Sequence, residues 1–250
     1  MKGKKHKQVL ALLLAAVLLA AGSLYYYTRG YETVAVTAQV APSGQFLLLI
    51  DAGHGGADGG AVSPGGVHES EINLAIAHRL EALAALYGIP TELTRHSQEI
   101  NYPPEAATIR AKKVADTRAR VEQINQATNA VVVSIHQNIF SQDSRVRGPQ
   151  VLFAPTPGSE AFATQMQGAL TQGLNLERPR DPIRVPSGVY IMNRITPPAI
   201  LVECGFLSNP EEEAKLKTPE YQLQLAAILL AGYVQWVQAS NTESLEGGGL

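Results

Sequence analysis

Short apolar runs alternate along this chain with longer stretches in which apolar residues recur every three or four positions. The segments Phe46–Ala61, Ala130–Asn138 and Ala199–Asn209 each begin with apolar residues and pass abruptly into polar residues or glycines, as buried strands that end in loops do. The helical periodicity covers four further segments, Glu71–Tyr87, Ala111–Thr128, Ser159–Gly173 and Tyr221–Ala239. We therefore predict a single α/β domain: a twisted, mixed, mostly parallel sheet of about six strands with helices on both faces.

The first residues have a different pattern. Met1–Lys7 contains four lysines and no acidic residue, and Val9–Tyr27 is a run of nineteen residues without a charge. A helix of this length spans a bilayer, and its basic end is expected to stay in the cytoplasm, with the rest of the chain outside. We expect a retained anchor, because the run is longer than most signal-peptide cores and ends in three tyrosines. Cleavage near the small residues Ala20–Gly22 is the alternative, and it would release a secreted protein.

The predicted organisation is therefore a basic end with a transmembrane signal anchor (1–27), a linker (28–45), a folded domain (46–239) and a disordered tail (240–250) that contains three consecutive glycines. Without the four lysines of the basic end, 16 of the 20 basic residues remain against 22 acidic ones, an excess of six negative charges that argues against a nucleic-acid partner. The single cysteine, Cys204, excludes an internal disulfide. Stability must come from the core, for which 45% apolar residues suffice.

Two histidines and two glutamates stand at predicted strand ends or in a loop: His54, Glu69, His136 and Glu203. Functional side chains gather at strand ends in open α/β sheets, so these residues can converge although they are far apart in the chain. Catalytic zinc is usually bound by three His, Asp or Glu side chains, with water in the fourth position. Two histidines and one carboxylate would satisfy this requirement and leave one glutamate for proton transfer.

Each of these residues also has a structural alternative. A histidine at a strand end is often only a hydrogen-bonded structural residue, and Glu69 could be no more than a favourable charge at a helix start. Glu203 is harder to explain in this way, because an unpaired carboxylate inside an apolar run costs several kcal/mol or becomes protonated. A phosphate-binding role for the loop GHGGADGG is disfavoured, since the loop lacks the lysine and the Ser or Thr of a P-loop.

The segments around these residues resemble one family. The relevant stretches are IDAGHGGADGGA, GGVHESEINLAIAHRL, LTRHS, the run from Arg120 through Asn125 to SIHQN, and PPAILVECGFLSNPEE. Over about Phe46 to Trp236 the chain is similar to the zinc-dependent N-acetylmuramoyl-L-alanine amidases of bacterial cell walls, often called amidase type 3. The chain departs from the family pattern at Ala52, where proline is frequent, at His68, where lysine is common, and at Ile139, where alanine is usual. None of these departures removes a candidate ligand.

The resemblance implies that one zinc ion per chain is bound by His54, Glu69 and His136, and that Glu203 is catalytic. It implies hydrolysis of the peptidoglycan amide bond between N-acetylmuramic acid and L-alanine of the stem peptide. Zinc lowers the pKa of its bound water from 15.7 to about 7, and Glu203 would take the proton and deliver it to the leaving nitrogen.

Two further residues, Asn138 and Arg147, follow His136 closely enough to be candidates for substrate binding. Some relatives carry an inserted helix that covers the zinc site. The interval between His136 and Glu203 holds only one helical pattern, so we expect an open site.

The compact size, the single anchor and the lack of repeats most resemble the sporulation and germination branch of the family, which removes stem peptides in the spore cortex before muramic δ-lactam forms. A vegetative amidase for cell separation would share every motif used here. The sequence is also compatible with a zinc peptidase acting within the stem peptide and with an inactive, anchored wall-binding protein. The predicted location is the cell membrane, single-pass, with the catalytic domain on the cell wall or spore cortex side. No pattern in the chain indicates an oligomeric state.

Overall fold

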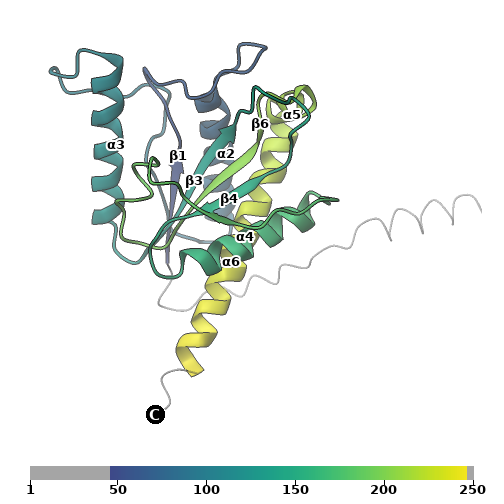
Figure 1. The fold of residues 1–250 in the computed structure, drawn as a ribbon. Coiled ribbons are helices and arrows are strands. Elements are labelled where there is room, and N and C mark those ends of the chain that lie inside the picture. Colours follow the sequence, from purple (N-terminus) through teal and green to yellow (C-terminus); the bar gives the residue numbers. More distant parts are fainter. Residues whose placement is uncertain (1–45, 247–250) are drawn as a thin grey trace, which may run out of the picture. The chain divides into compact units, whose positions relative to one another are not determined.

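The computed structural model describes residues 46–246 of the chain (Figure 1). The predicted anchor and linker (1–45) and residues 247–250 of the predicted tail lie outside the described residues. All described residues belong to one compact unit. Across 46–246, the helices lack the combination of length and apolar character that crossing a bilayer requires.

A six-stranded sheet with the order β2-β1-β3-β6-β4-β5 forms the centre of the domain. The strands are β1 (Leu47–Ala52), β2 (Thr91–Leu93), β3 (Ala130–Asn138), β4 (Gln150–Phe153), β5 (Ile183–Arg184) and β6 (Ala199–Phe206). β2, β1, β3 and β6 run parallel, whereas β4 is antiparallel to β6 and parallel to β5. The predicted α/β fold with a mixed, mostly parallel sheet is confirmed.

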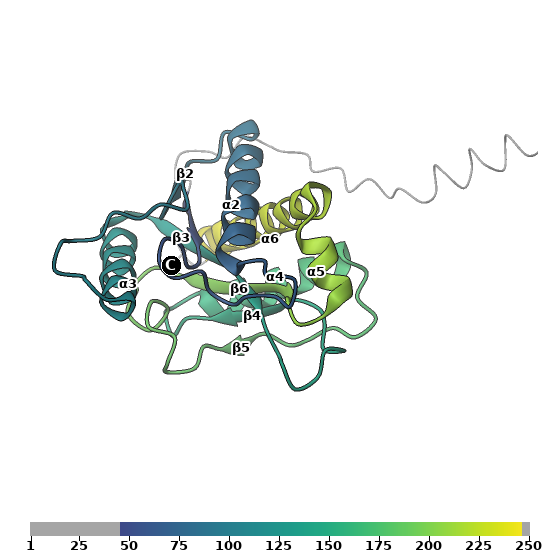
Figure 2. The same ribbon diagram turned by 90° about the horizontal axis from the view of Figure 1, so that it is seen from above.

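Helices cover both faces of this sheet. They are α2 (Glu69–Leu86), α3 (Ile109–Gln126), α4 (Ser159–Gly173), α5 (Pro210–Leu216) and α6 (Pro219–Glu246). Ile50 and Val133 face a core shared with α2, α4 and α6, while their neighbours Leu49 and Val132 face Ile124 of α3. Figure 2 shows α2 and α6 on the same side of β6 and β4. Cover on both faces explains why the strand sequences are continuous apolar runs rather than alternating ones.

The helix boundaries differ from the prediction mainly at the C-terminal end. The predicted disordered tail is wrong for Ser240–Glu246, because α6 continues to Glu246. No glycine or proline interrupts the helix between Ser240 and position 247, where the three glycines begin. α5 was not predicted, since its seven residues are too few to show a period; Asn209 caps it by accepting hydrogen bonds from the backbone N–H groups of Glu211 and Glu212.

Candidate metal centre and active site

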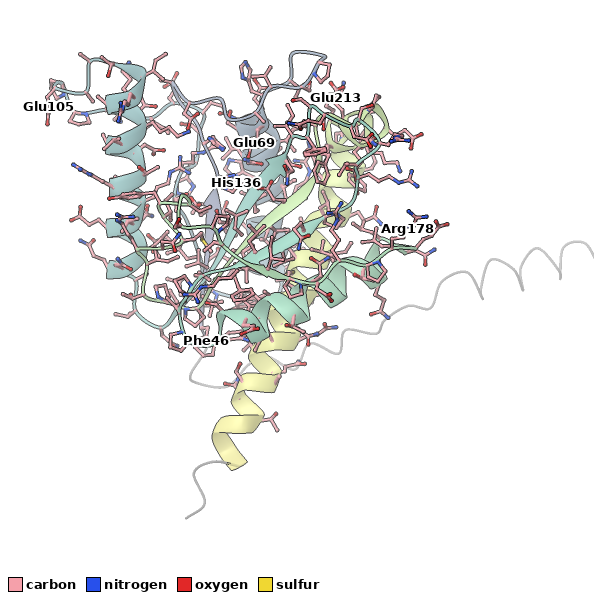
Figure 3. The ribbon with its side chains drawn as sticks, viewed as in Figure 1. Phe46, Glu69, Glu105, His136, Arg178 and Glu213 are labelled. Carbon is pink, nitrogen blue, oxygen red and sulfur yellow. The ribbon has the colours of Figure 1, made fainter. Side chains whose placement is uncertain are left out.

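Three of the candidate residues lie at or just after the carboxyl-terminal halves of parallel strands. His54 follows the end of β1 by two residues, His136 lies near the end of β3, and Glu203 lies beside His136 in the register of β3 and β6. Glu69 is the first residue of α2. Figure 3 shows Glu69 and His136 close to each other in the upper half of that view.

Three of the four predicted residues form a compact donor cluster. One potential ligand atom from each of His54, Glu69 and His136 lies within 4.8 Å of the other two. His54 Nε2 is 3.3 Å from Glu69 Oε2, and His136 Nδ1 is 2.9 Å from Glu69 Oε1. The two imidazole rings meet edge to face, with their centroids 5.0 Å apart. The predicted convergence of these three side chains is therefore present in the structure.

Glu203 lies next to this cluster without a hydrogen-bond partner for one of its oxygens. Its Oε2 atom is buried and makes no hydrogen bond. Burial, with the negative charge of Glu69, raises the pKa of Glu203 to about 7 against the opposing charges of His136 and His54. A carboxyl group in this state can both accept and release a proton near neutral pH.

His54 is held in an unusual backbone conformation by partners on both sides. Its φ of 61° lies in the left-handed region, which is costly for a residue other than glycine and is often found at functional sites. Asp58 Oδ2 lies 2.9 Å from His54 Nδ1, and Arg120 donates a 2.6 Å hydrogen bond to the His54 carbonyl oxygen. The hydrogen bond with His54 keeps the pKa of Asp58 well below its usual value although burial opposes this shift. The ionised Asp58 only accepts, so His54 Nδ1 carries a proton; in the neutral imidazole, Nε2 then keeps the lone pair that a metal ion needs.

Glu69 is fixed by contacts to both of its oxygens. Oε2 accepts a 2.8 Å hydrogen bond from the backbone N–H of Ala61, and Oε1 accepts a 3.0 Å bond from that of Gln137. Although burial favours the neutral form, the bond and charge of His136, the charge of His54 and the Ala61 bond lower the pKa of Glu69 to about 2. Burial also opposes charge on His136, but its bond to Glu69 and the charge of that carboxylate raise the pKa of His136 nonetheless. The site therefore holds an anionic carboxylate between two imidazoles, with one oxygen toward each ring, and these donor types occur in catalytic zinc sites.

Two glycines leave the space that these side chains occupy. A Cβ atom on Gly53 would lie 2.8 Å from His136 Cδ2 and still closer to the other edge of that ring. Gly60 has a φ of 71°, and a Cβ there would lie 2.6 Å from Glu69 Oε2. The glycine-rich loop thus permits close approach of the backbone to both ligands.

A buried ionic network behind the cluster was not recognised from the sequence. Arg120 bonds Asp51 Oδ1 at 3.1 Å and Asp116 at 2.8 Å, and it also donates to the Ala52 carbonyl oxygen. Arg95 donates to the Ala52 and Gly53 carbonyl oxygens. These guanidinium groups anchor the turn that carries His54. Asp51 directly follows the apolar residues of the first strand, which was a usable signal, whereas nothing in the LTRHS stretch marked Arg95 as buried.

The structure does not connect the two predicted substrate-binding residues with the cluster. Asn138 ends β3, and its side chain accepts a hydrogen bond from the backbone N–H of Ile139. Arg147 is exposed and lies 3.6 Å from Glu211. Their role in substrate binding stays a prediction. The one helix in the interval between His136 and Glu203 is α4, which packs on α6 and β4, and the side chains of His54 and His136 keep 19% and 18% of their surface exposed.

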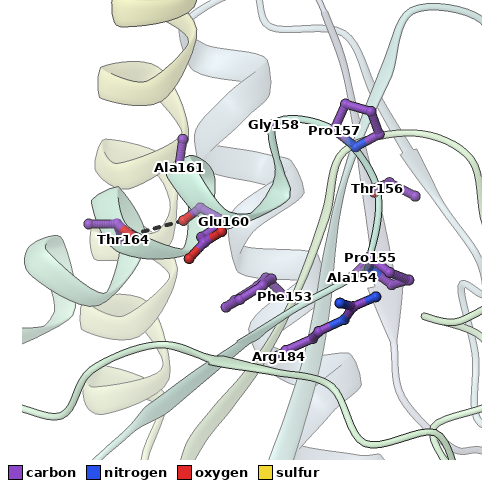
Figure 4. A pocket seen from close by; sticks show the side chains of 10 residues that line it. All are labelled: Phe153, Ala154, Pro155, Thr156, Pro157, Gly158, Glu160, Ala161, Thr164 and Arg184. Carbon is purple, nitrogen blue, oxygen red and sulfur yellow. Dashed lines mark hydrogen bonds between the residues drawn. The ribbon is translucent and has the colours of Figure 1, made fainter.

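A surface pocket of about 720 Å³ lies away from this cluster (Figure 4). It is lined by the end of β4, the first turn of α4 and Arg184. Because β4 is antiparallel to β6, Gln150 lies opposite Glu203 and Phe153 lies opposite Ile200. The pocket therefore lies near the amino-terminal ends of the parallel strands, at the opposite end from the cluster. None of the four candidate residues lines it.

Comparison with known proteins decides the family. Residues 48–233 match the family model described as N-acetylmuramoyl-L-alanine amidase. The chain belongs to this amidase family. The resemblance inferred from the motifs is thereby confirmed, and the protein is an amidase-type hydrolase. All four candidate residues lie within the matched range.

Among similar proteins, the germination-specific N-acetylmuramoyl-L-alanine amidase of Bacillus subtilis (strain 168) is 30% identical over 190 residues, which are 76% of this chain and 79% of that protein. The amidase AmiC of Neisseria meningitidis serogroup B is 27% identical, and the match spans only 53% of its length.

Among solved structures, the CwlD amidase from Clostridioides difficile, determined in complex with the GerS lipoprotein, superposes with a TM-score of 0.74 at 29% identity, covering 78% of this chain and all of that one. The amidase AmiC2 of Nostoc punctiforme gives a TM-score of 0.66 at 28% identity, covering 78% of this chain and 99% of that one.

Proposed function

We propose that this protein is a zinc-dependent amidase that cleaves the bond between N-acetylmuramic acid and L-alanine of the peptidoglycan stem peptide. The observation that carries the proposal is the donor cluster of His54, Glu69 and His136 beside the unpartnered carboxyl oxygen of Glu203, in a chain of the amidase family. Membership of the family supports the bond and the substrate class. The donor cluster supports the metal.

The donor set fits one zinc ion per chain. Two imidazole nitrogens and a carboxylate oxygen are the ligand types of catalytic zinc sites, and His54 and Glu69 are each oriented by a further hydrogen bond of the kind such sites use. When bound, zinc supplies a Lewis acid and a water whose pKa is lowered from 15.7 to about 7.

The protein's own groups divide the remaining work. Asp58 keeps the proton of the neutral His54 on Nδ1, which leaves the lone pair of Nε2 for a metal ion at the centre of the cluster. The ionised Glu69 provides the negative charge that retains a cation there. Glu203 has a pKa of about 7, and its Oε2 atom accepts a proton as the substrate carbonyl is attacked. The same atom then delivers this proton to the departing alanine nitrogen.

We further propose a role in the spore cortex and a position on the outer side of the cell membrane. The cortex role is supported by the relative named as germination-specific. The membrane position is supported by the lysine-rich start and the uncharged run Val9–Tyr27 in the sequence. Residues 46–246 would then be the catalytic unit.

Digestion of purified peptidoglycan tests the proposal. Mass spectrometry should detect free stem peptides that begin with L-alanine together with glycan strands whose muramic acid carries no peptide. A chelator should stop the release, and added zinc should restore it. Cleavage within the stem peptide would instead indicate a peptidase. An intact substrate in the presence of zinc would refute the amidase assignment. A preference for cortex over vegetative peptidoglycan, measured in parallel, would support the proposed role, and equal rates would argue against it.

A further inference from the structure

We infer that Asn73 is the positioning residue that holds the three candidate zinc ligands in their mutual arrangement, an inference that rests on the zinc site of the proposed function. Asn73 lies in α2, one helical turn after Glu69, and its side chain is completely buried. A polar side chain in such a position needs hydrogen-bond partners. Those partners belong to the segments of all three ligands.

The first two contacts use the amide nitrogen of Asn73. Nδ2 donates to the carbonyl oxygen of Gly53, the residue before His54, at 3.1 Å. It also donates to Oε1 of Glu69 at 3.3 Å. One NH₂ group therefore ties the turn that carries the first histidine to the carboxylate.

The third contact uses the amide oxygen. Gln137, the residue after His136, donates from Nε2 to Asn73 Oδ1 at 3.2 Å. The backbone N–H of Gln137 donates at the same time to Glu69 Oε1 at 3.0 Å. Two hydrogen bonds thus join the end of β3 to the start of α2: Gln137 donates one to Asn73 and one to Glu69.

This combination of contacts requires a side-chain amide. Two donor hydrogens and an acceptor oxygen must be presented from one short side chain, which a carboxylate and an apolar side chain of similar volume both fail to do. Replacing Asn73 does not leave Gly53 without a partner, because Arg95 Nη2 also donates to its carbonyl oxygen at 3.1 Å. Glu69 likewise keeps its bonds to Gln137 and Ala61. What the replacement removes is the one side chain that bonds to all three ligand segments at once.

Loss of such a supporting hydrogen bond typically weakens metal binding by about 10- to 100-fold. We expect the variant Asn73→Leu to show a loss of this size in zinc affinity, because Glu69 and the two histidine segments are no longer held in one arrangement.

Asn125→Leu provides the matched control. Asn125 also makes three side-chain hydrogen bonds, to the carbonyl oxygen of Arg194 and to the backbone and hydroxyl of Thr196, and none of these partners is next to a candidate ligand. This variant should lose stability but keep the zinc affinity of the wild type.

The experiment measures zinc affinity by competition with a chromophoric chelator, the absorption spectrum of the cobalt-loaded protein, and the melting temperature without metal, for the wild type and both variants. Weaker zinc binding and an altered cobalt spectrum in Asn73→Leu, with normal zinc binding in Asn125→Leu, would support the inference. Wild-type zinc affinity in Asn73→Leu would overturn it while leaving the proposed function intact. A wild type that binds no zinc would overturn the proposed metal and this inference together.

A second variant, Gln137→Met, removes the contact to Asn73 Oδ1 and keeps the backbone bond to Glu69. It should weaken zinc binding less than Asn73→Leu does. If Asn73→Leu fails to fold, Gln137→Met decides: weaker binding supports the inference, and wild-type affinity refutes it.

Discussion

Replacing Gly53 by alanine should damage the site through one added methyl group. Gly53 does not have a positive φ, so alanine is compatible with its backbone, and space alone opposes the substitution. The new Cβ would lie 2.8 Å from His136 Cδ2 and nearer still to Cε1 and Nε2, whereas ordinary contact begins at 3.4 Å. The ring must therefore retreat by about 1 Å, a displacement that costs about 100-fold in activity when it affects a catalytic group. Its bond to Glu69 is only 2.9 Å long, so the donor cluster cannot absorb the movement unchanged.

The measurement compares Gly53→Ala with Gly168→Ala. Gly168 lies in α4, and a Cβ there meets nothing within 4 Å, so its substitution should leave activity unchanged and raise stability by about 0.5–1 kcal/mol. Zinc affinity and amidase rate are measured for both variants, with urea unfolding to show that Gly53→Ala is folded. A Gly53→Ala protein with wild-type zinc affinity and rate would refute the argument that backbone proximity to His136 shapes this site.

Three further outcomes are expected. Glu203→Gln should keep one zinc ion per chain, measured by metal analysis, and lose about 10²- to 10⁴-fold in the amidase rate; a rate near that of the wild type would remove Glu203 from the proton transfer. Asp58→Asn should weaken zinc binding by about 10- to 100-fold because the anionic acceptor for His54 Nδ1 is lost. The control variant Lys113→Met, which removes the lysine that pairs with Asp58, should bind zinc normally. Equal zinc affinities in the two variants would contradict this role of Asp58. Burial opposes ionisation of Asp51, but the charge of Arg120 and the hydrogen bonds from the Ser134 and Thr94 hydroxyl groups lower its pKa. Asp51 therefore stabilises the fold at pH values above its unfolded pKa near 3.8, and this contribution is lost as the pH falls through the folded pKa. Urea unfolding of the wild type below pH 4 should therefore show a steeper loss of stability than that of Asp51→Asn, and parallel curves would exclude the effect.

The sequence by itself determined the fold class and the identity of the chemical groups. Apolar runs that stop at His54, His136 and Glu203 marked three strands that end at the site, because strands covered on both faces must be apolar throughout while their ends are free to carry polar groups. α4 was predicted with its observed bounds, since its periodicity is continuous and ends at Gly173.

Only the tertiary structure decided how these groups are held. The antiparallel direction of β4 and the short helix α5 have no periodic signal in the sequence. The roles of Asp58 and Asn73 were missed for a physical reason: a polar residue in a loop or helix acquires a function through its partners. For Asn73 these partners come from segments 20 and 64 positions away, which only folding brings into hydrogen-bond distance.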